Sequence, residues 1–118
     1  MTELIIDYRL PGYNEAHNEA RTHWSQAART KKQETEAIAW LCKAQKLQPI
    51  KGKVDIGISW GTKGDHRDPD NIYSGIKYIL DGLVLAGILG GDTKQYVQRI
   101  ENNYNDAYSI TVVSIWEK

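Results

Sequence analysis

The sequence is short of the features that mark secreted and membrane proteins. Its 118 residues include a single cysteine, Cys42, so no disulfide can form within the chain, and a reducing cytoplasm is the expected compartment. The most apolar stretch, residues 79–91, contains an aspartate and is shorter than the ~20 apolar residues that cross a bilayer. The first residues have neither the basic segment nor the apolar segment of a signal peptide. We therefore expect a cytoplasmic protein with no membrane partner.

Net charge is also missing, because 15 lysines and arginines balance 15 aspartates and glutamates. The distribution is more informative, since residues 19–53 hold eight basic side chains and only three acidic ones. Part of the balancing acidic charge lies in an aspartate-rich segment in the middle of the chain. A basic segment beside carboxylates fits an enzyme that binds a polyanion while holding a metal ion. A solvated helix face has the same composition, so both interpretations stay open.

The length and the periodicity predict one α+β domain over residues 1–118. We expect strands at 4–10 and 54–60, helices at 25–45 and 71–86, and a closing hairpin of strands 96–104 and 108–116 that turns at Asn105-Asp106. This order, β-α-β-α-β-β, predicts a mixed or antiparallel sheet with two main helices. The inward-facing candidates of the first helix are Ala28, Ala37, Trp40, Leu41 and Ala44.

The densest chemical signal is the segment 65–71, at the junction of a strand and a helix. Pro69 restricts the backbone of Asp68 to extended or turn conformations, and Asp70 follows beside it. Two neighbouring carboxylates repel unless a cation neutralises them, and hard oxygen ligands suit Mg²⁺. An Asp-Pro turn followed by a helix cap explains the same residues without a metal. An EF-hand starting at Asp68 is excluded, because its fifth and twelfth positions are Ile72 and Ile79.

The following helix has a polar side that extends the aspartate segment. Five apolar residues form a stripe spanning about 180–280° from Asp70 on a helical wheel, while Lys77 and Asp81 lie within about 20° of Asp70. Asp70, Lys77 and Asp81 can therefore line one edge of a cleft, with Lys77 and Asp81 as an i, i+4 pair. Asp92, after two glycines, would complete a metal-ligand set if the fold brings it beside the first two aspartates. The stripe is Ile72, Ile76, Ile79, Leu80 and Leu83.

In this order and spacing, the residues resemble the RusA-type Holliday junction resolvases. The resemblance runs through most of the chain and rests on Pro11-Gly12-x-Asn14, Arg21-Thr22-His23-x-Ser25, Arg67-Asp68-Pro69-Asp70-Asn71-Ile72, Lys77-x-x-x-Asp81-Gly82-Leu83, and Asp92 with Gln95. It implies a small homodimeric, Mg²⁺-dependent endonuclease, of a kind often encoded by prophages, that cuts four-way DNA junctions by paired nicks. Mn²⁺ is expected to substitute for Mg²⁺.

Family roles carry over residue by residue. The resemblance assigns metal binding to Asp68, Asp70 and Asp92 and a catalytic lysine to Lys77, and Asp81 matches a supporting aspartate. We expect Mg²⁺ to activate a water and Lys77 to stabilise charge on the phosphate. His66 is a candidate supporting base. The candidates for binding DNA phosphates are Arg21, His23, Arg29, Lys31, Lys32 and Arg67.

Two departures from the family pattern are visible. The spacing from Asp70 to Lys77 is longer by about one helical turn, and Gly91-Asp92 replaces the usual pair of aspartates. Two competing functions are a non-catalytic DNA-binding module, whose aspartates serve only in turns and caps, and a metal-dependent phosphohydrolase of small phosphate esters.

Overall fold

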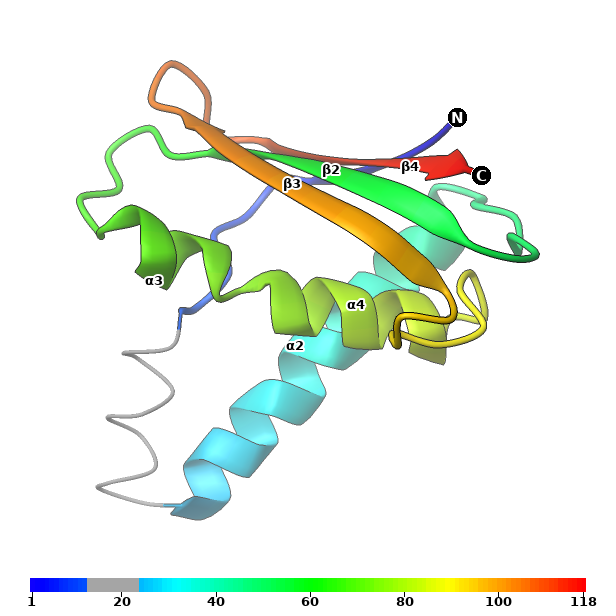
Figure 1. The fold of residues 1–118 in the computed structure, drawn as a ribbon. Coiled ribbons are helices and arrows are strands. Elements are labelled where there is room, and N and C mark those ends of the chain that lie inside the picture. Colours follow the sequence, from blue (N-terminus) through cyan, green and yellow to red (C-terminus); the bar gives the residue numbers. More distant parts are fainter. Residues whose placement is uncertain (13–23) are drawn as a thin grey trace.

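A four-stranded sheet carries all of the helices on one face (Figure 1). The computed structural model describes residues 1–12 and 24–118. Its elements follow the chain in the order β1 (Thr2–Ile6), α2 (Trp24–Ala44), β2 (Val54–Gly61), α3 (Pro69–Tyr73), α4 (Ile76–Leu85), β3 (Val97–Asn105) and β4 (Thr111–Glu117). The α+β class and the order of elements are therefore confirmed. No helix in the described part of the chain is long and apolar enough to span a membrane.

The strands lie in the order β1-β4-β2-β3, with β2 and β3 parallel and the other neighbours antiparallel. The predicted hairpin of the last two strands is wrong, because β2 separates β3 from β4. The reason is the apolar pattern of each strand. Val113 and Ile115 of β4 are buried and take a central position, whereas most of β3 is polar and exposed and takes an edge. A helical crossover between β2 and β3 then gives the usual parallel pair.

Two boundaries differ from prediction. β1 ends at Ile6, opposite the first residue of β4, Thr111, rather than continuing to residue 10. The predicted helix 71–86 is divided into α3 and α4 at Ser74-Gly75. Ser74 Oγ donates to the carbonyl of Asn71, and such side-chain bonds compete with the helical pattern.

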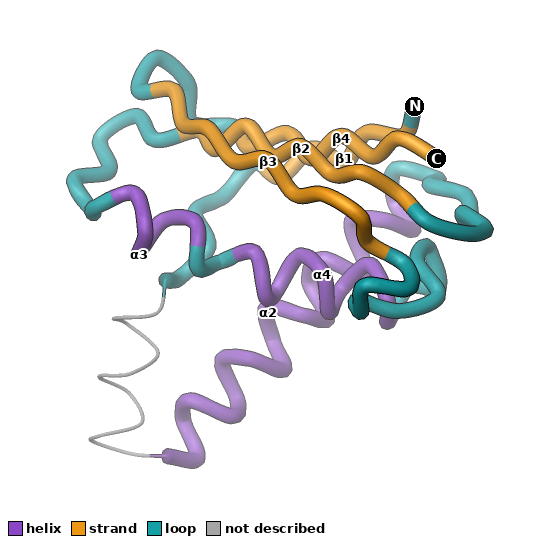
Figure 2. Tube along the Cα trace, in the orientation of Figure 1, coloured by secondary structure: helices purple, strands orange, loops and turns teal. Residues whose placement is uncertain are grey.

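The core lies between the sheet and the helices (Figure 2). Val54, Ile56, Ile58 and Trp60 alternate inward along β2 as expected, and the predicted stripe of the second helix is buried except for Ile76, which is half-buried. The predicted inward face of α2 is wrong in part.

On α2 the fully buried side chains are Ile38 and Cys42, while Trp40 is 66% exposed. Trp40 lies about 200° from Ile38 on the helix, and therefore on its opposite side. Ala28 and Ala44 are exposed as well. Cys42 is fully buried, and burial raises the pKa of its thiol to about 11, so it packs as a small apolar residue of the core.

Helices α2 and α4 approach closely at Gly82. A Cβ atom at this position would lie 2.4 Å from Ile38 Cβ and 3.1 Å from the carbonyl oxygen of Thr35. Only glycine therefore permits this contact, which fixes the spacing of the two helices and of the groove beside them.

Candidate functional site

Lys77 lies between two carboxylates that are far apart in the sequence. Its Nζ atom is 3.2 Å from Asp81 Oδ1 and 3.3 Å from Asp92 Oδ2. Asp81 is one helical turn further along α4, which confirms the predicted i, i+4 pair, and Asp92 comes from the loop between α4 and β3. Hydrogen bonds that Lys77 donates, first to Asp81 and then to Asp92, raise its pKa. Lys77 is thus a cation throughout the neutral pH range and offsets one of the two negative charges.

The loop returns Asp92 to α4 because its two glycines pack against an aromatic ring. A Cβ at Gly90 or Gly91 would lie 2.6 or 2.7 Å from atoms of Tyr96. The carbonyl of Thr93 then accepts hydrogen bonds from the backbone N–H groups of Tyr96 and Val97, where β3 begins. The same packing explains why a second aspartate does not precede Asp92, since a side chain at Gly91 would displace the ring.

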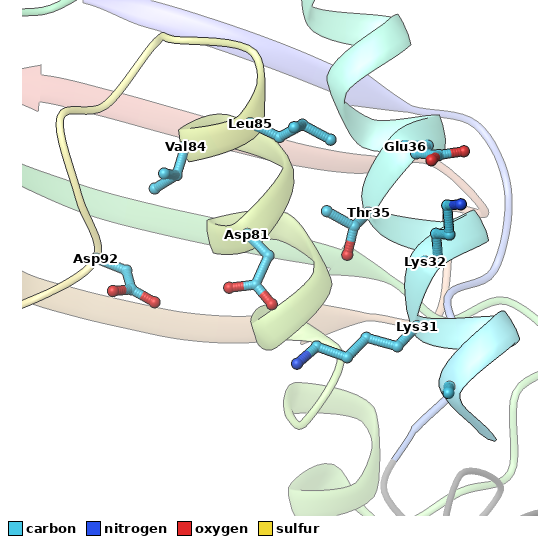
Figure 3. Close-up of a pocket in the computed structure, with 9 residues that line it drawn as sticks. Lys31, Lys32, Thr35, Glu36, Asp81, Val84, Leu85 and Asp92 are labelled. Atoms are coloured by element: carbon cyan, nitrogen blue, oxygen red, sulfur yellow. The ribbon is translucent and has the colours of Figure 1, made fainter. Parts of the chain in front are cut away.

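A cavity of about 650 Å³ opens between α2 and α4 beside this ion cluster. Asp81 and Asp92 lie on one side, and Lys31 of α2 extends toward Asp81 from the other (Figure 3). Lys31 also lines a second cavity, of about 400 Å³, together with Lys77. Arg29, Lys31 and Lys32 are all exposed on α2. The structure therefore places three of the predicted DNA-contact residues on the helix that faces the acidic cluster.

Sequence reasoning missed two polar residues of this cavity, Thr35 and Glu36. Thr35 lines it, and within the described residues its hydroxyl is buried with no hydrogen-bond partner. The available signal was helical spacing, because Thr35 lies one turn beyond Lys31 on α2.

Asp68 and Asp70 lie at the start of α3. Asp68 is the N-cap residue, with an extended backbone (φ −66°, ψ 152°), yet its carboxylate makes no capping hydrogen bond. Both aspartates are exposed, and Asp70 lies in the first turn. The predicted extended conformation before Pro69 is confirmed. A helix cap accounts for the backbone here but leaves the two carboxylate groups without a structural partner among the described residues.

The acidic side chains of the predicted metal site fall into two pairs. Asp68 and Asp70 begin α3, whereas Asp81 and Asp92 meet at Lys77. If α3 and α4 formed one straight helix, the eleven residues from Asp70 to Asp81 would separate these two acids by ~16 Å along the helix axis. Within the described residues, no three His, Cys, Asp or Glu side chains are grouped to hold a metal ion. The oxygen donors suit Mg²⁺, but one centre formed by Asp68, Asp70 and Asp92 stays a prediction.

Arg67 is occupied within the protein. Its guanidinium donates to both carboxylate oxygens of Asp65 and to the carbonyl of Leu10, and its side chain is only 13% exposed. Hydrogen bonding from Arg67 holds the pKa of Asp65 below its ordinary value. Arg67 thus connects the segment after β1 to the loop before α3, and a role in binding DNA stays a prediction.

His66 is exposed. Arg21 and His23 lie outside the described residues.

Comparison with known proteins adds no family assignment, since no protein-family model and no curated protein matches the chain.

Proposed function

We propose that this protein is a Mg²⁺-dependent, structure-specific endonuclease that resolves four-way DNA junctions by paired nicks. The supporting observation is that Asp92 joins Lys77 and Asp81 beside a cavity whose other wall, on α2, carries Lys31 and Lys32. Three components that the resemblance assigns to catalysis and DNA binding are thereby brought to one side of the molecule. Because lysine and aspartate side chains both line the cavity, we infer a phosphodiester substrate.

In this proposal, the basic residues of α2 bind the phosphate backbone. Arg29, Lys31 and Lys32 are exposed on one helix and carry three positive charges. Release of counterions from DNA makes such binding fall steeply as salt rises. Lys31 lines both cavities, so it is the residue of this group that lies nearest to the acidic cluster.

Lys77 has a different role, which is to neutralise negative charge on the reacting phosphate. Its ammonium group is held by two carboxylates at 3.2 and 3.3 Å. A positioned cation stabilises a phosphate transition state without having to reorganise during the reaction. Asp81 contacts the Lys77 side chain from the same helix, α4, while Asp92 contacts it from the loop between α4 and β3.

The proposed Mg²⁺ site is defined by the residues that could donate oxygen ligands. Asp68, Asp70 and Asp92 are the residues that would hold Mg²⁺, which supplies an activated water when it is bound. Asp68 and Asp70 begin α3, whereas Asp92 contacts Lys77, so these three acids do not form a preassembled site within the described residues.

The separation of Asp68 and Asp70 from Asp92 favours the second candidate, a DNA-binding module without catalytic activity. An endonuclease and a binding module would both bind branched DNA, but only the endonuclease would cut it.

The test is incubation with an end-labelled four-way junction and with linear duplex of the same sequence, with and without Mg²⁺ or Mn²⁺. We expect paired nicks in the junction only when metal is present. Asp70→Asn and Asp92→Asn should abolish nicking and keep most of the binding, because each removes a charge with little change in shape. Asp7→Asn, at an exposed position beyond the end of β1, is the matched control and should cut at the wild-type rate.

Junction binding without nicking at any metal concentration would leave the module as the correct function. Nicking by both variants at the wild-type rate would exclude these aspartates from the reaction. Cleavage of small phosphate esters in place of the junction would instead identify the phosphohydrolase.

A further inference from the structure

One edge of the sheet is open, and it belongs to β3. β3 pairs with β2 on one side and is the last strand in the sheet order (Figure 1). The carbonyl of Asn105 accepts a hydrogen bond from the N–H of Thr62, which follows β2, so the peptide groups of Asn105 point toward β2. Because these directions alternate along a strand, those of Ile100, Asn102 and Tyr104 point away from the sheet. Among the described residues, no strand pairs with them.

The opposite edge of the sheet is closed by a side chain. The amide of Gln45, just after α2, donates to the carbonyl of Ile5 at 2.7 Å and accepts from the N–H of Ile5 at 2.9 Å. Gln45 therefore takes the place of a neighbouring strand on β1. Blocking of this kind prevents edge-to-edge association. The chain protects the edge of β1 and leaves the longer edge strand, with nine residues in β3, without this protection.

β3 is mostly polar, but two of its large apolar side chains are exposed. Ile100 and Tyr104 are 38% and 49% exposed. In the parallel register they lie beside Ile56 and Trp60, on the face of the sheet that carries the helices. Arg99 and Glu101 lie on the opposite face and form an ion pair with each other. The edge thus combines unpaired backbone groups, exposed apolar surface and two opposite charges.

We propose that β3 pairs antiparallel with β3 of a second copy of this chain, about a two-fold axis at Ile100. The outward-pointing peptide groups of Ile100 then bond to those of the partner's Ile100, and the two sheets join into one. Gln98 lies opposite the partner's Asn102, at the position where the register of β3 against β2 shifts by one residue. Arg99 and Glu101 occupy the intervening non-hydrogen-bonded positions, where opposed Cα atoms are only ~4.5 Å apart.

Charge selects this register over its neighbour. With the axis at residue 100, Arg99 of each copy lies opposite the partner's Glu101, and Glu101 opposite the partner's Arg99. Moving the axis to residue 101 would put the two copies of Glu101 opposite each other, and like charges directly opposed destabilise a sheet. The Arg99–Glu101 ion pair of each chain thus becomes part of a group of four alternating charges in the dimer.

This inference does not rest on the nuclease proposal, because the dimer is measured without DNA. A homodimer is expected from the family resemblance, but the resemblance does not say which surface forms it. The two-fold axis would make the two copies of every site equivalent.

Sedimentation velocity of the full chain over a range of concentrations tests the proposal. Wild type should dimerise. Arg99→Glu alone and Glu101→Arg alone each put like charges in opposition twice and should raise the dissociation constant by about 10- to 100-fold. An equal mixture of the two variants restores opposite charges at both positions, so it should form a heterodimer with an affinity close to that of wild type.

Two further variants locate the interface on the molecule. Ile100→Lys opposes two ammonium groups at the axis, leaves the Arg99–Glu101 pair intact, and should give a monomer whose circular dichroism matches wild type. Trp40→Glu, on the exposed face of α2, should leave the dimer unchanged. A wild-type monomer at all concentrations, a mixture that stays monomeric, or a dimer lost only in Trp40→Glu would each overturn the proposal.

Discussion

Replacing Lys77 by methionine separates a structural role of this residue from a catalytic one. Lys77 contacts Asp81 and Asp92 at 3.2 and 3.3 Å, but its side chain is 57% exposed. We expect the Lys77→Met protein to fold with nearly unchanged stability and to lose cleavage of a DNA junction. Methionine keeps the length and the apolar stem of the side chain and removes only the charge.

The expected stability change follows from the two distances. In bulk water, a pair of unit charges 3.2 Å apart interacts by ~1.3 kcal/mol, and salt reduces this further for an exposed pair. Ordering a lysine side chain costs up to ~2 kcal/mol. The two contacts therefore nearly cancel the cost, and measured exposed pairs contribute about 0–1 kcal/mol. A catalytic cation that acts on the transition state is worth more, about a 100-fold loss in rate or greater.

Urea denaturation at pH 7 measures the first quantity and single-turnover junction cleavage the second. This pH is suitable because the pKa of Lys77 is raised, so its stabilising effect is complete in neutral solution and is lost only as pH rises through the raised pKa. Lys63→Met is the matched control, at an exposed lysine in the loop after β2. A fall in unfolding free energy above ~2 kcal/mol would show a structural clamp, and cleavage at the wild-type rate would refute the catalytic role.

Three further predictions concern stability. Gly82→Ala should lower the free energy of unfolding by about 1–2 kcal/mol in urea denaturation, because the 2.4 Å approach to Ile38 forces the helices apart and outweighs the ~1 kcal/mol that alanine gains in helix propensity; a more stable variant would contradict the close contact. Asp65→Asn should cost about 3 kcal/mol at pH 7 by removing the negative charge that pairs with the buried Arg67 guanidinium. Since the pKa of Asp65 lies below its ordinary 3.8, its contribution is present above that pH and is lost as pH falls through the lowered pKa, so the variant should show a flatter acid denaturation profile, and an unchanged profile would contradict this. Tyr8→Phe should leave stability unchanged or raise it by up to about 1 kcal/mol, because the Tyr8 hydroxyl is buried with no hydrogen-bond partner among the described residues; a loss above that size in the urea midpoint would reveal a missing partner.

Local patterns in the sequence predicted the elements, but not how the last strands are arranged. The alternation along β2 and the apolar stripe of α4 depend on residues close together in the chain, and both predictions are confirmed. The hairpin prediction failed because pairing of a strand depends on the whole sheet. β4, which carries the buried Val113 and Ile115, is a central strand, and β1 and β2 pair with its two edges. The polar residues of β3 and the apolar residues of β4 indicate an edge strand and a central strand, but neither sequence shows which strands lie beside β4.

The candidate site was predictable to a similar extent. The Lys77–Asp81 pair follows from helical spacing, which sequence shows directly. The contact with Asp92 depends on a loop folded around Tyr96, and no periodicity reveals that. The separation of Asp68 and Asp70 from this cluster was also hidden, because Ser74 and Gly75 divide a segment whose pattern is that of one amphipathic helix.

The proposed nuclease activity depends most on whether acids from α3 and from the loop before β3 share one divalent cation. Fe²⁺ bound in place of Mg²⁺, with added hydrogen peroxide as oxidant and ascorbate as reductant, generates hydroxyl radicals that cut the backbone close to the metal, so it locates the ion in the protein–junction complex. We predict cuts near residues 68–70 and near residue 92 from a single ion, with both sets lost in Asp92→Asn. Cuts at one of these segments alone, or cuts near 68–70 that persist in Asp92→Asn, would contradict a shared site.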